Sequence, residues 1–131
     1  MTTKLCQILG AVLLVVGVIG FAKPDLLGMH LTPVHNVVHL ASGSLALYFG
    51  NVAPQNARAF SAIFGTVYLL LGVIGIVAPD QVASLIGHGP MGDGRALMPD
   101  NLVHILLGGV FVFAALATTR LGALPTHKSA A

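Results

Sequence analysis

The sequence has no glutamate and no tryptophan, a single cysteine, and only ten charged side chains, six Lys or Arg and four Asp. Charged residues make up 8% of the chain, whereas a soluble globular domain carries about 25%. This scarcity excludes a soluble domain, whose surface ten charges could not cover. Disorder is excluded as well, because it requires low hydrophobicity and high charge, and 56% of this chain is hydrophobic. The composition predicts one integral membrane domain, residues 1–131.

The lone cysteine and the weak charge excess narrow the chemistry further. Cys6 has no second cysteine for an intramolecular disulfide or a thiolate metal pair. It also lacks a nearby base, so we interpret it as a core or lipid-facing residue. The net charge is only +2 and the basic residues are not clustered, which argues against a nucleic-acid partner. The expected surroundings are the lipid bilayer.

Four apolar runs predict four transmembrane helices. The runs are residues 5–22, 34–50, 59–78 and 102–119. None contains Asp, Glu, Lys or Arg, and at ~1.5 Å rise per residue each reaches roughly 26–30 Å, the thickness of a hydrocarbon core. Helices are expected because an open strand cannot satisfy its backbone in lipid. The first run does not match a signal peptide, since it is long and no A-x-A cleavage site follows it.

The chain also contains an internal repeat. Residues 10–25 align with 65–80, and residues 36–43 align with 101–108. The repeat units, 7–50 and 62–118, are each predicted to form a helical hairpin. Two spans return the chain to its starting side, so the hairpins should be parallel and related by a pseudo-twofold axis along the membrane normal.

The loop charges predict the orientation of these spans. Four basic residues fall on the side of the termini and two on the other side. The first group is Lys4, Arg58, Arg120 and Lys128, and the second is Lys23 and Arg95. Since basic residues favour the cytoplasmic side, both termini are expected in the cytoplasm, with the protein in a bacterial inner membrane.

Glycines predict where the helices pack closely, and one capping pair predicts where the second helix begins. Six glycines recur at equivalent places in the two units, and their faces predict close helix contacts. They are Gly10, Gly17, Gly43, Gly65, Gly72 and Gly108. Thr32 followed by Pro33 is typical of an N-cap and a first-turn proline, so the second helix should begin there.

Any chemistry must come from the polar residues inside the spans. Asn36 and His39 are three apart and share a helix face, and Asn101 and His104 repeat that arrangement. The pseudo-twofold should bring the two faces toward each other or into equivalent seams. In the first interpretation these residues are structural and hold helices together at about 1 kcal/mol per contact.

Two other interpretations remain open. His39 and His104 could ligate one haem iron or separate (bacterio)chlorophyll magnesium ions, with Gly43 and Gly108 leaving room for the flat ring. Alternatively His35 and His39, with His30 or Asp100, could bind a divalent metal at the bundle rim.

One stretch of the chain resembles a known family. Residues 31–43, together with 65–75, are similar to small four-span bacterial membrane proteins catalogued as a domain of unknown function. The most specific part is P-x-H-N-x-x-H-x-x-x-G at residues 33–43, and the resemblance covers about residues 7–118. It implies a four-helix inner-membrane protein and implies no activity. Ser42 and Ser44 depart from the family, which has aliphatic residues beside this glycine.

The inventory of the spans favours a non-catalytic role. Every carboxylate lies in a predicted loop, and the spans offer only histidine, asparagine, hydroxyl groups and one thiol. We therefore expect a small accessory subunit that stabilises a larger membrane complex or self-associates. The alternative is a tetrapyrrole-binding subunit that uses His39 and His104.

Overall fold

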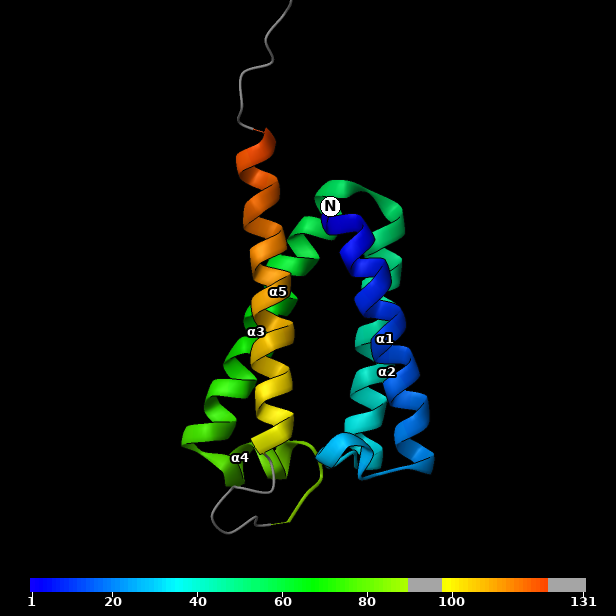
Figure 1. Ribbon diagram of the computed structural model, residues 1–131, viewed down its shortest axis with the longest axis vertical. Coiled ribbons are helices and arrows are strands. Elements are labelled where there is room, and N and C mark those ends of the chain that lie inside the picture. The colour runs from blue at the N-terminus through cyan, green and yellow to red at the C-terminus, as the bar shows by residue number, and fades with distance from the viewer. Residues whose placement is uncertain (90–97, 123–131) are drawn as a thin grey trace, which may run out of the picture.

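A computed structural model of the chain describes residues 1–89 and 98–122, and side chains as far as residue 117. Within these ranges the chain is helical and has no strands, which confirms the all-α class. The elements are α1 (Thr2–Ala22), η1 (Leu26–Gly28), α2 (Pro33–Val52), α3 (Pro54–Val77), α4 (Pro79–Leu85) and α5 (Met98–Gly122), as Figure 1 shows. Arg95 and Lys128, which enter the charge count above, lie outside the described residues.

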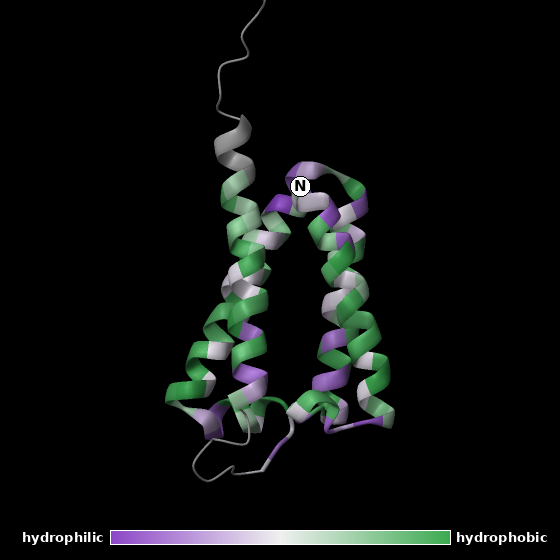
Figure 2. Ribbon diagram, viewed as in Figure 1, coloured by the Kyte–Doolittle hydropathy of each residue, from purple (hydrophilic) through white to green (hydrophobic). Residues whose placement is uncertain are grey.

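Three of the described helices are long and apolar enough to cross a membrane. They are α1, α3 and residues Met98–Ala117 of α5. The fourth predicted span, α2, has a similar length of 20 residues but is not among them, because it carries several polar side chains near its start. Figure 2 shows these helices as mostly hydrophobic, with hydrophilic segments near the starts of α2 and α5.

The helices extend beyond the apolar runs at several ends. α3 begins at Pro54 rather than at residue 59, so the predicted loop 51–58 reduces to Ala53, an extended residue between α2 and α3. Proline suits the first turn of a helix, where its missing N–H is no loss. α2 begins at Pro33, and the Thr32 hydroxyl oxygen accepts a hydrogen bond from the His35 N–H at 3.1 Å. The predicted cap is confirmed.

The helices pack in two pairs. α1 contacts α2 and α3 contacts α5 far more extensively than either pair contacts the other, and Figure 1 shows each pair side by side. A side chain at Gly43 would come within 2.7 Å of the Gly10 carbonyl oxygen, and one at Gly108 within 2.6 Å of the Gly65 carbonyl oxygen. Glycines therefore let the two backbones approach in each pair. We call the α1–α2 contact and the α3–α5 contact the two seams.

The two pairs meet in a small core near the N-terminus. Cys6, Ala57 and Phe111 are fully buried there and come from α1, α3 and α5. The Cys6 sulfur lies 3.2 Å from the Ser61 hydroxyl oxygen. Of the two interpretations of Cys6, the core position is the one observed.

Candidate functional site

The two asparagines lie in equivalent seams rather than facing each other. Asn36 is fully buried, and its amide fills the space left by the missing side chain of Gly20, where a Cβ would collide with it. Asn101 occupies the same position against Gly75. Gly20 and Gly75 were not among the predicted packing glycines, although both belong to the repeated pattern.

The histidines turn away from these seams and form a cluster between the hairpins. His35 and His39 come from α2 and His104 from α5, and they are only 2%, 4% and 5% exposed. The His35 and His39 rings stack with centroids 4.5 Å apart, and the His35 and His104 centroids lie 5.6 Å apart. The cluster therefore has three members, and His35 is the one in ring contact with both others.

A buried carboxylate closes the cluster at the rim. Asp100, 2% exposed, accepts a hydrogen bond from the His30 backbone N–H at 3.0 Å. Its carboxylate also lies 3.7 Å from the His35 Nδ1 atom, and that nitrogen lies 3.2 Å from the His30 carbonyl oxygen. His88 places its Nε2 atom 3.2 Å from the same carbonyl. These contacts join the segment before α2 to the start of α5.

Tyr68 borders the cluster from α3. Its ring lies 5.1 Å from that of His104, and its hydroxyl donates to the Ser42 hydroxyl oxygen at 3.3 Å. A cavity of about 180 Å³ opens beside these rings. Its walls come from α2, α3, α4 and α5, and from Ile86, which directly follows α4. The lining residues are His35, Val38, Tyr68, Leu71, Val82, Leu85, Ile86 and His104.

Several ring nitrogens in the cluster have no hydrogen-bond partner among the described residues. They are His35 Nε2, His104 Nδ1 and both ring nitrogens of His39. The ring of His39 stacks on that of His35. A buried polar atom left without a partner costs about 1–3 kcal/mol.

The geometry does not favour a haem held between His39 and His104. The cavity of about 180 Å³ is smaller than the ~300–1,000 Å³ of sites for drug-sized ligands. His35 also lies against both His39 and His104, so no open slot for a macrocycle separates the two proposed axial ligands.

The geometry does not favour a divalent metal either. In the described ranges, no three His, Cys, Asp or Glu side chains are arranged to hold an ion. The His35 and His39 planes are only 27° apart. Because the lone pair of an imidazole lies in its ring plane, two stacked rings do not direct their nitrogens at one point.

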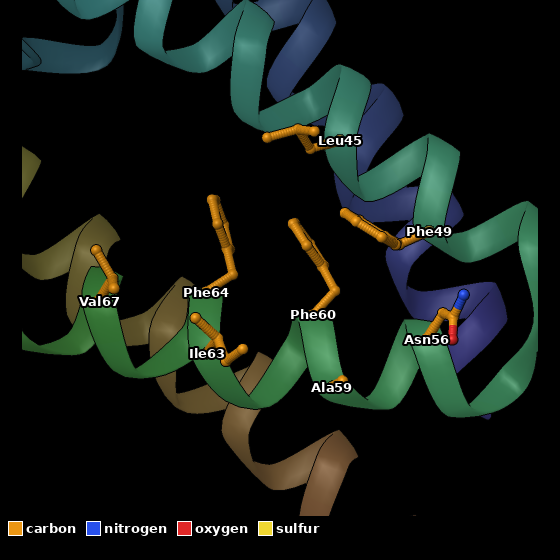
Figure 3. Close-up of a pocket in the computed structure, with 8 residues that line it drawn as sticks. All are labelled: Leu45, Phe49, Asn56, Ala59, Phe60, Ile63, Phe64 and Val67. Atoms are coloured by element: carbon orange, nitrogen blue, oxygen red, sulfur yellow. The ribbon is translucent and has the colours of Figure 1, made fainter.

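A second and larger cavity lies between α2 and α3. It is a groove of about 570 Å³ with an almost wholly apolar lining, shown in Figure 3. Phe49 and Phe60 stack with centroids 5.4 Å apart, and Phe60 and Phe64 with centroids 4.9 Å apart. Its lining residues are Leu45, Phe49, Asn56, Ala59, Phe60, Ile63, Phe64 and Val67.

Comparison of the chain with models of protein families, with curated proteins and with solved structures finds no match.

Proposed function

We propose that this chain is a non-catalytic, four-span subunit of the bacterial inner membrane that stabilises a larger membrane assembly. The observation that carries the proposal is the apolar groove between α2 and α3, which the described residues leave open. We also propose membership in the four-span family of unknown function, on the strength of the motif at residues 33–43.

The burial of its polar residues supports α2 as the fourth span. His35, Asn36, His39 and Ser42 are at most 7% exposed, so they face protein rather than lipid. Mean hydropathy is averaged over all residues of a helix, whether they face lipid or protein. The buried polar residues therefore lower the mean hydropathy of α2, although most of its exposed residues are apolar. The connectivity agrees, because α2 packs along α1 and only Ala53 separates it from α3.

Equivalent contacts support two parallel hairpin repeats with a pseudo-twofold axis along the membrane normal. A Cβ at Gly17 would come within 3.0 Å of the Asn36 carbonyl oxygen, and one at Gly72 within 2.7 Å of the Asn101 carbonyl oxygen. The same equivalence holds for the contacts of Gly10 with Gly43 and of Gly65 with Gly108, and for the packing of Asn36 against Gly20 and of Asn101 against Gly75. Each seam thus uses the same residue types in the same order.

The charge distribution supports cytoplasmic termini. Lys4 and Arg58 lie at the end of the molecule where α1 and α3 begin, and no carboxylate lies near them in sequence. Lys23 lies at the opposite end together with Asp25, Asp80 and Asp100. An excess of basic residues marks the cytoplasmic side.

The shape of the groove fits a transmembrane helix of a partner subunit. Phe60, Phe64 and Val67 line it at spacings of four and three residues, the ridge pattern into which another helix packs. The stacked phenylalanines form a preformed wall. Van der Waals packing against such a surface is what drives helix association in lipid, where no hydrophobic gain is available.

Cross-linking in native membranes tests this proposal. Ile63 in the groove is 69% exposed and Val15 on the outer face of α1 is 56% exposed, so each accepts a photoreactive side chain. We expect position 63 to form one defined adduct with another membrane protein and position 15 to form none. Substitution Phe64→Ala, which reshapes the wall, should reduce the yield at position 63 several-fold.

Other occupants would give different products. An adduct with lipid alone at position 63, or equal protein adducts at positions 63 and 15, would contradict the accessory role. An adduct of this chain with itself would replace the foreign subunit by a second copy.

A further inference from the structure

We propose that a cluster of histidines around one carboxylate holds the two helix pairs together at neutral pH and lets them separate at acid pH. The helix pairs are α1–α2 and α3–α5, and the cluster lies where they meet, at the end of the molecule that carries η1 and α4. We call this cluster the histidine junction. Its members are His30, His35, His39, His88, His104 and Asp100.

Histidines of one helix pair lie against histidines of the other. His35 of α2 and His104 of α5 have ring centroids 5.6 Å apart. His30, before α2, and His88, after α4, have centroids at the same separation of 5.6 Å. His39 stacks on His35 with centroids 4.5 Å apart. Five of the six histidines in the chain therefore gather where the pairs meet, so a charge gained there acts between the pairs.

The junction holds fewer negative charges than rings that can gain a proton. The Asp100 carboxylate lies 3.7 Å from His35 Nδ1 and 3.9 Å from His30 Nδ1, so it compensates one imidazolium. Among the described residues, no carboxylate forms an ion pair with His39 or His104. Both rings are buried, and like charges at such short separations repel strongly away from water. A second proton therefore destabilises the closed junction.

The other charged groups that the structure describes at this end are exposed. They are Lys23, Asp25 and Asp80. Asp25 lines an open hollow together with His30 and His88, where water screens its charge. These groups therefore give little compensation to the buried rings.

Neutral hydrogen bonds keep the junction closed until the rings gain charge. Tyr68, which α3 places beside His104, donates to the Ser42 hydroxyl oxygen of the other helix pair. The Thr32 hydroxyl donates to the Ile86 carbonyl oxygen. Neither hydroxyl titrates in the acid range, so these two bonds do not themselves respond to pH.

The two helix pairs are built to move against each other as units. Glycine contacts close the seam within each pair, whereas the contacts between the pairs are far less extensive. At the opposite end the pairs are joined by the buried core around Cys6 and by the single residue Ala53 between α2 and α3. Figure 1 shows this connection beside the N-terminus. The pairs can therefore separate at the junction while the opposite end acts as a hinge.

Separation is coupled to proton binding. An imidazole in water gains a proton below about pH 6.5, and separation admits water to the rings. The open form therefore binds more protons than the closed form, so acid shifts the population toward the open form. For each extra proton that the open form binds, the ratio of open to closed protein rises by up to about tenfold per pH unit.

Distances between spin labels measure this separation directly. Pairs of labelled cysteines replace exposed residues of the full-length Cys6→Ser protein, which is placed in nanodiscs of phosphatidylcholine and equilibrated at pH 7.5 or 5.0. Val37 on α2 and Leu102 on α5 report across the junction, whereas Ile8 on α1 and Val37 report within one helix pair. We expect the ratio of long to short 37–102 distances to rise at least about tenfold at pH 5.0. The 8–37 distances should stay unchanged.

Phenylalanine variants test whether the histidine rings carry the response, because phenylalanine keeps an aromatic ring and cannot gain a proton. We expect His39→Phe and His104→Phe each to reduce the acid-induced rise several-fold. Val103→Phe is a matched control, since Val103 precedes His104 on α5 and is 41% exposed. This control should respond to acid as the parent protein does.

Three outcomes would overturn the proposal. The first is a 37–102 distance distribution that is the same at pH 7.5 and 5.0. The second is equal broadening of the 37–102 and 8–37 distances, or no recovery on return to pH 7.5, because either indicates acid unfolding. The third is a full acid response in the phenylalanine variants. If one of these variants does not fold at pH 7.5, the other and the Val103→Phe control still decide.

Discussion

Two neighbouring glycines on α5 have very different surroundings. A Cβ at Gly108 would collide with the Leu69 backbone nitrogen and lie 2.6 Å from the Gly65 carbonyl oxygen, whereas one at Gly109 meets nothing within 4 Å. We expect Gly108→Ala to destabilise the protein by about 1–3 kcal/mol through overpacking. Gly109→Ala should be neutral or stabilise it by up to about 1 kcal/mol, because alanine favours a helix.

Thermal unfolding in detergent, followed by far-UV circular dichroism, measures this difference. Equal midpoints for the Gly108→Ala and Gly109→Ala proteins would show that α3 and α5 do not approach as closely as described.

The packing of Asn36 against Gly20 and of Asn101 against Gly75 permits a sharper test of the repeat. Gly20→Ala places a methyl group against the Asn36 amide, and Asn36→Ala removes that amide. The double variant should therefore be more stable than the sum of the single changes predicts, by about 0.5–3 kcal/mol. The Gly75 and Asn101 cycle in the other hairpin should show a coupling of the same sign and similar size. Coupling in only one hairpin would argue against equivalent seams.

At the scale of elements, α2 depends most on its first turn. The Thr32 hydroxyl accepts from the His35 N–H at 3.1 Å and donates to the Ile86 carbonyl oxygen, which ties α2 to the end of α4. Thr32→Ala should cost about 0.5–2 kcal/mol. Thr66→Ala is a suitable control, because that exposed hydroxyl donates to the Ala62 carbonyl oxygen of its own helix. Equal losses of unfolding free energy in the two variants would contradict a capping role for Thr32.

The positions of helices were predictable from the sequence where interactions within a few residues determine them. The apolar runs and the Thr32–Pro33 pair place α1 and α2 well, because hydropathy and capping act within a few residues. The start of α3 at Pro54 was missed, since Gln55 and Arg58 end the apolar run but are compatible with a helix. Hydropathy marks the part of a helix in lipid rather than its ends.

The candidate site depends on contacts between distant parts of the chain. The repeat predicts that Asn36 and His39 share a helix face, as do Asn101 and His104. In the structure the asparagines pack against Gly20 and Gly75 inside each helix pair, and the histidines contact one another between the pairs. It did not predict that Asp100 would accept from the His30 N–H across 70 residues of sequence, nor that His35 would contact both other histidines. These contacts follow from how the hairpins sit together. The one sequence clue was the alignment of His35 with Asp100 in the two units.

At the scale of the whole molecule, we propose that α2 crosses the membrane, so that the chain has four spans. Two exposed positions flank this helix, Leu27 in η1 and Gln55 at the start of α3. If α2 is a span, they lie on opposite sides. If only α1, α3 and α5 cross, the two positions lie on the same side.

Cysteine accessibility decides between these arrangements most directly. Single cysteines at positions 27 and 55, in a Cys6→Ser background, are treated with a membrane-impermeant maleimide in intact and in permeabilised bacterial cells. We expect position 27 to react in intact cells and position 55 only after permeabilisation. The reverse pattern would keep four spans and invert the orientation. Labelling of both positions in intact cells, or of neither, would contradict the four-span account.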